Sequence, residues 1–113
     1  MKITRPKNTK ERGAMEFLVY KEGNAFIGVC LTFDIVEEGQ DPIALMKSIE
    51  EAATLHLEIV IKENMSNNLL NRYAPEEYWK KYFEILEHIK KSNEDNSYFR
   101  RSSYQQTQAV AVA

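Results

Sequence analysis

The sequence predicts one α+β domain, in which a three-stranded antiparallel sheet is followed by a long helix, a second helix and a candidate C-terminal fourth strand. Its 113 residues suffice for one domain and exclude a multidomain enzyme. Apolar runs with aromatic and β-branched residues come first, and segments with helical periodicity follow them. A content of 43% hydrophobic and 11% aromatic residues also excludes a disordered or fibrous chain.

The first two strands are predicted to form a β-hairpin. Residues 17–20 are apolar, residues 21–24 are polar, and the Gly-Asn pair in the polar segment supplies the positive φ that a tight turn needs. Residues 26–31 are apolar on both faces, as in a strand of a sheet that is covered on both sides or paired with another subunit. We expect a third strand at residues 33–36 and a turn at residues 37–40.

The first helix is predicted to begin at Pro42 and to end near Asn64. Asp41 precedes it as the N-cap, and proline suits the first helical position because its missing N–H would have no partner there. An apolar stripe of helical periodicity faces the core. Three apolar residues of the C-terminal half lie outside this stripe, so that half needs a second covering surface: Leu55, Ile59 and Ile61.

The second helix is predicted from Pro75 to about Lys91, with acidic residues in its first turn and lysines in its last, as the helix dipole favours. Its apolar face is rich in aromatic residues, which either form a binding surface or pack on the sheet or the first helix. Within the tail that follows, residues 109–112 are the candidate fourth strand, at a sheet edge or swapped to another subunit. Three segments result: a basic arm at 1–14, the α+β domain at 15–91 and the tail at 92–113.

The residues that could carry catalysis are few. The one acidic cluster near a strand end comprises Asp34, Glu37, Glu38 and Asp41. Metal-dependent hydrolysis needs carboxylates that converge on one point, whereas adjacent residues of an extended segment point in opposite directions and Asp41 already caps a helix. We therefore expect no enzymatic activity, no metal and no cofactor, and we keep a hydrolase that uses Asp34, Glu37 and Glu38 as the rival interpretation.

The cysteine and histidine residues also favour a structural role. Cys30 stands alone in an apolar run, which is typical of a buried thiol in a reducing compartment. His56 lies on the apolar stripe of the first helix and is expected to be a core residue, whereas His88 lies toward the polar side of the second. Neither a membrane span nor a signal peptide is expected. These features predict a soluble, cytoplasmic protein.

Charge is distributed unevenly along the chain. Residues 1–14 carry a net charge of +4, which leaves −6 for residues 15–113. A basic arm can contact nucleic-acid phosphates, or it can dock on an acidic surface of its own chain or of a partner. The candidate nucleic-acid contacts are Lys2, Arg5, Lys7, Lys10 and Arg12.

Residues 17–57 resemble the HicB antitoxin family, the larger members of the HicA–HicB toxin–antitoxin pairs. The resemblance rests on the hairpin Phe17-Leu18-Val19-Tyr20 to Phe26-Ile27-Gly28-Val29, the segment Phe33-Asp34-Ile35, the turn at Gly39 and the helical Ile49-Glu50-Glu51-Ala52. It implies a degenerate ribonuclease H-like module without the catalytic acids. The implied function is to bind a small ribonuclease toxin of the HicA type, which cleaves messenger RNA, and to cover its active surface.

The chain departs from the family pattern at its C-terminal end. Only about twenty residues follow the second helix, which is too few for the helix-turn-helix or ribbon-helix-helix DNA-binding domain of many HicB proteins. Because the apolar faces exceed what a three-stranded sheet can cover, we expect a homo-oligomer or a partner to complete the burial. A nucleic-acid-binding regulator that uses the basic arm and an orphan oligomeric adaptor are the alternatives to an antitoxin. The residues predicted to contact the toxin lie on the second helix and its lead-in: Arg72, Tyr78, Trp79 and Tyr82.

Overall fold

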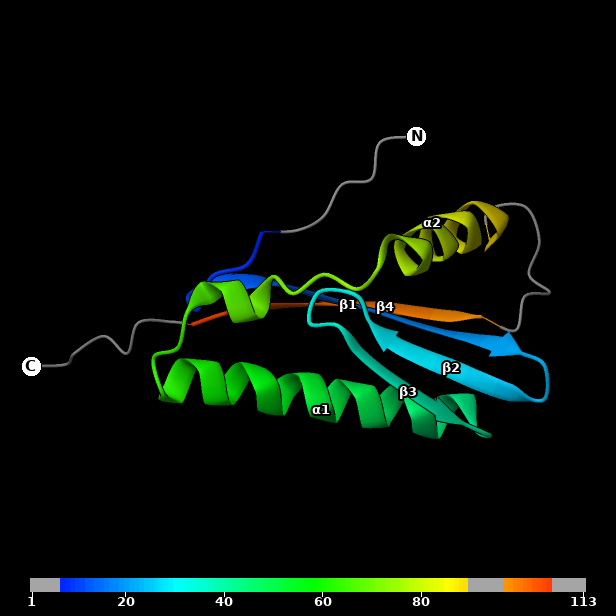
Figure 1. Cartoon of the computed structure of the whole chain (residues 1–113), viewed down its shortest axis with the longest axis horizontal. Helices are drawn as coiled ribbons and strands as arrows, with labels where there is room; N and C mark the ends of the chain where they lie inside the picture. The colour runs from blue at the N-terminus through cyan, green and yellow to red at the C-terminus, as the bar shows by residue number, and fades with distance from the viewer. Residues whose placement is uncertain (1–6, 90–96, 107–113) are drawn as a thin grey trace, which may run out of the picture.

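The computed structural model describes residues 7–89 and 97–106 and consists of an antiparallel sheet with one long helix on each face (Figure 1). The sheet has the strand order β3-β2-β1-β4. The elements are β1 (Arg12–Glu22), β2 (Ala25–Cys30), β3 (Ile35–Gly39), α1 (Pro42–Lys62), the short 3-10 helix η1 (Asn67–Leu70), α2 (Glu76–Ile89) and β4 (Tyr98–Gln105). The predicted α+β class and its order of elements are confirmed.

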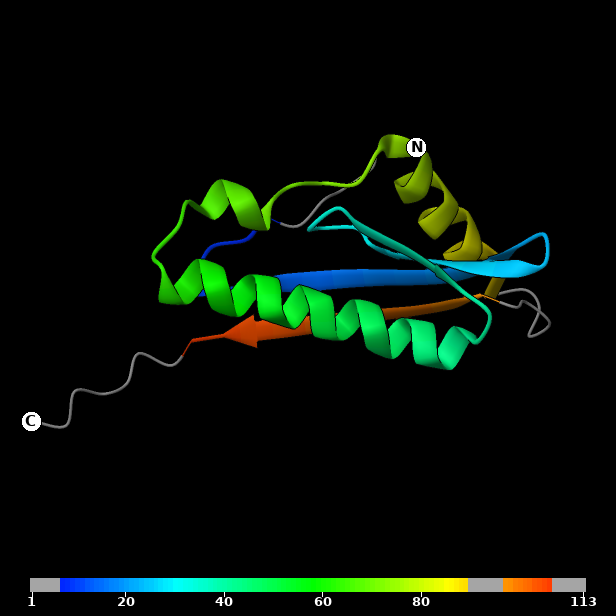
Figure 2. The same cartoon turned by 60° about the horizontal axis from the view of Figure 1, so that its bottom comes forward.

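The central strand β1 is buried on both faces because a helix covers each of them. Phe17 and Val19 belong to the core under α1, whereas Leu18 belongs to the core under α2. Strand β1 pairs with β2 through the predicted hairpin, and Gly23 in its turn has a φ of +63°, a value that glycine adopts without strain. The apolar run of β1 therefore reflects cover by two helices of the same chain (Figure 2).

Helix α1 begins and ends close to its predicted bounds. The Asp41 side chain accepts hydrogen bonds from the backbone N–H groups of Ile43 and Ala44, at 3.0 and 3.4 Å, which confirms its role as N-cap. The helix lies against β1, β2 and β3. At Gly28, an added Cβ would lie 2.9 Å from Cγ of Leu45, so glycine lets α1 pack closely on β2.

Helix α2 covers the opposite face of the sheet (Figure 1). Trp79 is completely buried and Tyr82 is 5% exposed, in one cluster with Leu18 and Val29 from the sheet and Leu31 from the turn that follows β2. The alternative in which the aromatic residues of this helix pack on the sheet is therefore the observed one. Because α2 covers the face of the sheet that α1 leaves open, burying the two apolar faces of β1 and β2 does not require a second subunit.

The third strand lies later in the sequence than predicted. Residues 31–34 form a turn in which Asp34 adopts a φ of +56°, and β3 runs from Ile35 to Gly39. The left-handed conformation at Asp34 reverses the chain between β2 and β3. The predicted strand at 33–36 therefore lay two residues too early at its start and three at its end, and most of the predicted turn at 37–40 belongs to β3.

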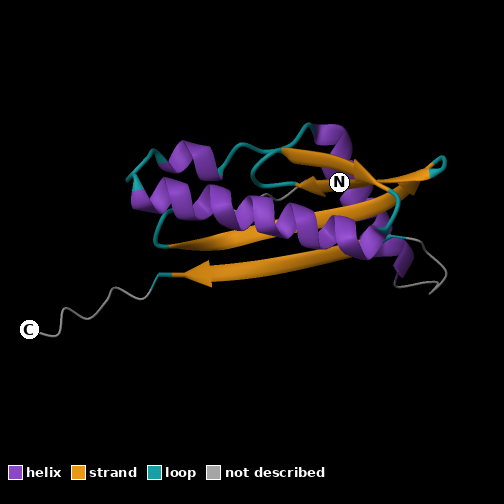
Figure 3. Cartoon of the chain, turned by 90° about the horizontal axis from the view of Figure 1, so that it is seen from below, coloured by secondary structure: helices purple, strands orange, loops and turns teal. Residues whose placement is uncertain are grey.

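Strand β4 lies at the edge of the sheet opposite β3 and pairs with β1 (Figure 3). The predicted C-terminal fourth strand thus exists, at Tyr98–Gln105, while residues 109–112, the segment we expected to form it, lie outside the described residues. On one face, Arg100 forms an ion pair of 2.6 Å with Glu50 of α1. On the other face, the ring of Phe99 contacts that of Tyr82, with 6.2 Å between ring centroids.

The N-terminal boundary of the domain also differs from the expected one at residue 14. Strand β1 begins at Arg12, and Asn8 is only 1% exposed. Its side chain donates to the carbonyl groups of Ala14 and Leu70, at 3.0 and 2.9 Å, and accepts from the N–H of Ala14 at 2.8 Å. Residues 8–14 are therefore part of the fold, because Asn8 ties them to the connection after α1.

Candidate functional site

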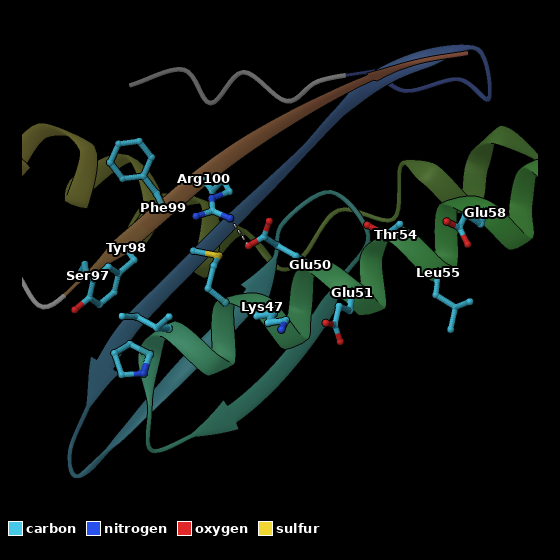
Figure 4. Close-up of a pocket in the computed structure, with 13 residues that line it drawn as sticks. Lys47, Glu50, Glu51, Thr54, Leu55, Glu58, Ser97, Tyr98, Phe99 and Arg100 are labelled. Atoms are coloured by element: carbon cyan, nitrogen blue, oxygen red, sulfur yellow. Dashed lines mark hydrogen bonds and ion pairs between the residues drawn. The ribbon is translucent and has the colours of Figure 1, made fainter. Parts of the chain in front are cut away.

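A groove of about 880 Å³ lies between α1 and β4, and we call it the α1–β4 groove. Helix α1 packs over β1, β2 and β3 but extends little over the edge strand, so the face of β4 beside α1 stays open. Figure 4 shows Glu50 and Arg100 pointing toward one another across the groove, while Leu55 and Glu51 project from α1 away from β4, at its outer rim.

Apolar side chains are exposed along this groove. Ile43 is 73% exposed, Leu55 57% and Tyr98 42%. Ile59, one helical turn after Leu55, is 45% exposed and extends the same ridge of α1. Large apolar side chains grouped on one face are typical of a surface that binds another macromolecule.

The charged residues of the groove differ in whether an opposite charge of the same chain neutralises them. Arg100 is neutralised by Glu50 within the chain. Glu51 and Glu58 are exposed on α1 at the rim of the groove, where Lys47 is the cation that α1 contributes to the lining. Lys62, four residues after Glu58, lies outside the lining. The rim that α1 contributes is therefore apolar and mildly acidic, a combination that suits a cationic partner.

A second concave surface lies where the N-terminal segment crosses β4. This basic hollow has a volume of about 620 Å³ and includes the cationic residues Lys7, Arg12 and Arg101. Two of these belong to the predicted basic arm. A third arm residue, Lys10, donates instead to the carbonyl oxygen of Met65 at 2.6 Å. The arm residues Lys2 and Arg5 lie outside the described residues.

One buried acid lies beside the basic hollow and gave no signal in the sequence pattern. Glu16 of β1 is 7% exposed, and its carboxylate lies 3.6 Å from the guanidinium of Arg101, the residue opposite it on β4. Burial raises the pKa of Glu16, and the positive charge of Arg101 acts in the opposite direction. Arg101 is thereby partly engaged with its own chain.

The structure does not place the predicted toxin-contacting residues on one surface. Arg72 is exposed and Tyr78 is half-buried, but Trp79 and Tyr82 are buried between α2 and the sheet. The prediction that all four are surface residues was wrong for Trp79 and Tyr82. The physical reason is that β1 and β2 present an apolar second face, which α2 covers with these rings.

The acidic residues of the rival hydrolase interpretation do not converge. Glu37 accepts a hydrogen bond of 2.6 Å from the hydroxyl of Ser48, whereas its neighbour Glu38 points to the other face of β3. Asp34 is exposed in the preceding turn and Asp41 caps α1. Within residues 7–89 and 97–106, no three His, Cys, Asp or Glu side chains lie close enough to hold a metal ion.

The expected structural roles of Cys30 and His56 agree with their surroundings. Cys30 is buried with its sulfur 3.6 Å from the hydroxyl of Thr32, and burial raises the pKa of its thiol. A ring nitrogen of His56 lies 2.6 Å from the carbonyl oxygen of Leu69, and its ring contacts Phe33. The side chain of His88 lies outside the described part of the structure.

Comparison with known proteins adds no assignment. A scan against protein-family models, a search of curated proteins and a search of solved structures each find no match to this chain. Among the helices of the described residues, none combines the length and the hydrophobicity that crossing a bilayer requires. Within the described residues, the α1–β4 groove and the basic hollow are two concave surfaces that could receive a partner.

Proposed function

We propose that this chain is a non-catalytic binding protein that acts like an antitoxin, silencing a small ribonuclease toxin of the HicA type by covering its active surface. The α1–β4 groove is the observation that carries the proposal. Both faces of β1 are covered within the chain, yet α1 still exposes Ile43 and Leu55 beside Glu51 and Glu58. The groove replaces the aromatic residues of α2 as the proposed contact surface.

Charge favours this class of partner. A ribonuclease must bind RNA phosphates, so its active surface carries cationic side chains. The carboxylates of Glu51 and Glu58 would attract such a surface and orient it, while burial of Leu55 and Ile43 would supply affinity. The resemblance of residues 17–57 to HicB antitoxins supports the same kind of partner.

The absence of catalysis and the cytoplasmic setting are parts of the same proposal. The acids at the end of β3 are separated from one another, so the chain would inhibit by occlusion rather than by chemistry. The unpaired thiol of Cys30 suits the reducing environment in which a messenger-RNA-cleaving toxin works.

The test begins at the reading frame beside the one that encodes this chain. We expect that frame to encode a short basic protein whose expression arrests growth and cleaves RNA, and we expect co-expression of this chain to relieve both effects. Leu55→Glu should abolish the relief, because it places a charge in the apolar contact. Glu22→Gln, at the exposed end of β1, is the matched control and should keep the relief.

Two results would contradict the proposal. One is a neighbouring protein that neither arrests growth nor cleaves RNA. The other is full relief of toxicity by Leu55→Glu at the same expression level as the unmodified chain. Circular dichroism of the variant separates loss of binding from loss of fold, because Leu55 is 57% exposed and contributes little to the core.

The basic hollow supports a second candidate function, a nucleic-acid-binding regulator. Lys7, Arg12 and Arg101 line one concave surface and could contact successive phosphates. This function predicts RNA or DNA binding whose affinity falls steeply with salt concentration. Arg12→Glu should weaken binding and flatten the salt dependence, whereas Lys21→Glu, at the far end of β1, should not. Binding that does not depend on salt would exclude it.

A further inference from the structure

We propose that two copies of this chain associate by pairing their β4 strands in antiparallel fashion, about a two-fold axis that passes through Ser102. The paired strands would join the two sheets into one continuous sheet. This inference concerns the outer edge of β4, not the α1–β4 groove, and it does not depend on the proposed antitoxin function.

The hydrogen-bonding pattern of β4 defines which groups are free. The N–H of Gln106 donates to the carbonyl oxygen of Glu11 at 2.7 Å, so these residues form a hydrogen-bonded pair of the β1–β4 ladder. Hydrogen-bonded pairs alternate along an antiparallel ladder. Hence Arg100, Ser102 and Tyr104 direct their backbone groups toward β1, whereas the residues between them direct theirs outward: Phe99, Arg101, Ser103 and Gln105. In the described parts of the chain, no strand pairs with this outer edge.

The two edges of the sheet are protected very differently. The opposite edge, β3, has five residues and carries Glu37 and Glu38, which are the short length and the charge that discourage edge pairing. Strand β4 has eight residues and contains neither proline nor glycine. Its two charged residues, Arg100 and Arg101, lie beside Glu50 and Glu16 of the same chain and so repel an incoming strand less than free charges would.

The sequence of β4 is complementary to itself in one register. With the axis at Ser102, the outward groups of Arg101 meet those of the second copy's Ser103, and those of Phe99 meet the second copy's Gln105. Each such pair exchanges two backbone hydrogen bonds. Shifting the axis to residue 101 would place like charges directly opposite one another, which destabilises pairing. Shifting the axis to residue 103 would shorten the overlap of the two strands.

The charge and chemistry of the edge favour a second copy over an unrelated strand. The register places a serine on the axis and opposes each arginine with a neutral residue, so no group of the dimer needs a new counter-ion. A two-fold axis perpendicular to the sheet also keeps α1 of both copies on the same face, so that the two α1–β4 grooves would adjoin.

Sedimentation equilibrium of the full chain, run at concentrations up to 100-fold above the lowest, tests the proposal. We expect the mass to rise toward twice 13.2 kDa with concentration. Ser103→Pro removes an outward N–H without touching the ladder to β1, and it should hold the mass at 13.2 kDa with an unchanged circular dichroism spectrum. Ser103→Ala keeps that N–H and should associate like the unmodified chain.

Cysteine cross-linking tests the register. Ser102→Cys would place the two introduced thiols opposite one another on the axis, and mild oxidation should give a covalent dimer. Ser103→Cys, opposed to the second copy's Arg101, should not cross-link, and the native Cys30 is buried. A chain that remains monomeric at every concentration overturns the proposal, as does a dimer that Ser103→Pro leaves intact. Loss of toxin binding in Ser103→Pro, with the chain monomeric throughout, would assign the edge to the toxin instead.

Discussion

Replacing Asn8 with alanine is expected to destabilise the whole domain, although this residue lies near the N-terminus. Its side chain makes three buried hydrogen bonds, of 2.8–3.0 Å, to backbone groups of Ala14 and Leu70. Each contributes about 1 kcal/mol net, and an orphaned buried partner costs about 1–3 kcal/mol. Asn8→Ala should therefore lower the free energy of unfolding by roughly 3 kcal/mol, which for a domain of about 100 residues corresponds to a fall in Tm of roughly 12–24 °C.

Asn8→Asp tests the contribution of the hydrogen bonds separately from that of packing, because the two side chains have nearly the same shape. The introduced carboxylate would face two carbonyl oxygens that now accept hydrogen bonds from the Asn8 amide. Burial and this repulsion would raise the pKa of the new carboxyl group above its unfolded value of about 3.9. The protonated form is then the better tolerated one, so the stability that the variant loses relative to the unmodified chain should be smallest below about pH 4 and should grow as the pH rises through the raised pKa.

Thermal unfolding followed by circular dichroism measures both effects. Asn71→Ala is a useful comparison, because the Asn71 side chain binds the same segment through part-buried hydrogen bonds: it accepts from the N–H of Asn8 at 2.7 Å and donates to the carbonyl oxygen of Asn8 at 2.8 Å. It also donates to the carbonyl oxygen of Asn67 and accepts from the hydroxyl of Tyr73. We expect that substitution to cost less than Asn8→Ala, because water can reach part-buried partners and replace the lost side chain. A Tm for Asn8→Ala within about 2 °C of the unmodified chain would refute the argument, since it corresponds to less than one hydrogen bond.

Three further substitutions test other parts of the fold. Gly28→Ala should cost about 1–3 kcal/mol in urea unfolding, because its Cβ would lie 2.9 Å from Leu45 and force α1 away from β2; an unchanged urea midpoint would mean that α1 shifts without strain. Trp79→Ala should cost about 3–5 kcal/mol, because the lost ring is fully buried; a loss under about 1 kcal/mol would show that α2 is not docked as described. Burial raises the pKa of Glu16 above its ordinary 4.5 despite the nearby Arg101, so its ionisation destabilises the fold and stability falls as pH rises through the raised pKa. Glu16→Gln should remove that part of the pH dependence of Tm, and the same slope in both proteins would contradict the assignment.

Local patterns were sufficient to predict most of the elements. The N-cap at Asp41 and the hairpin turn at Gly23 are determined by the backbone preferences of those residues, and the structure confirms both. The shift of β3 could not be predicted in this way, because it depends on the left-handed conformation of Asp34, which asparagine and aspartate adopt only where the surroundings select it. Strand β4 contains the polar run Arg-Arg-Ser-Ser. Its sequence therefore lacks the alternation of apolar and polar residues that would predict a strand.

The candidate site was harder to predict because the same pattern fits two outcomes. Trp79 and Tyr82 lie on an apolar helical face, and such a face packs equally well on a partner or on the chain's own sheet. The choice depends on whether the sheet has a second apolar face, which Leu18 and Val29 provide. Asn8 gave no signal at all, since a single polar residue in a basic segment has no periodicity.

The apolar residues that remain exposed after folding lie on α1 rather than α2, and the proposed function therefore places the partner on α1. The C-terminal half of α1 was expected to need a second covering surface because of Leu55, Ile59 and Ile61. Ile61 packs against the core, but Leu55 and Ile59 remain 57% and 45% exposed, one turn apart on the same ridge. The sheet buries the hydrophobic surface of α2, whereas part of the hydrophobic surface of α1 stays exposed. Substitutions on this ridge should therefore affect binding while sparing stability, and those at Trp79 should do the reverse.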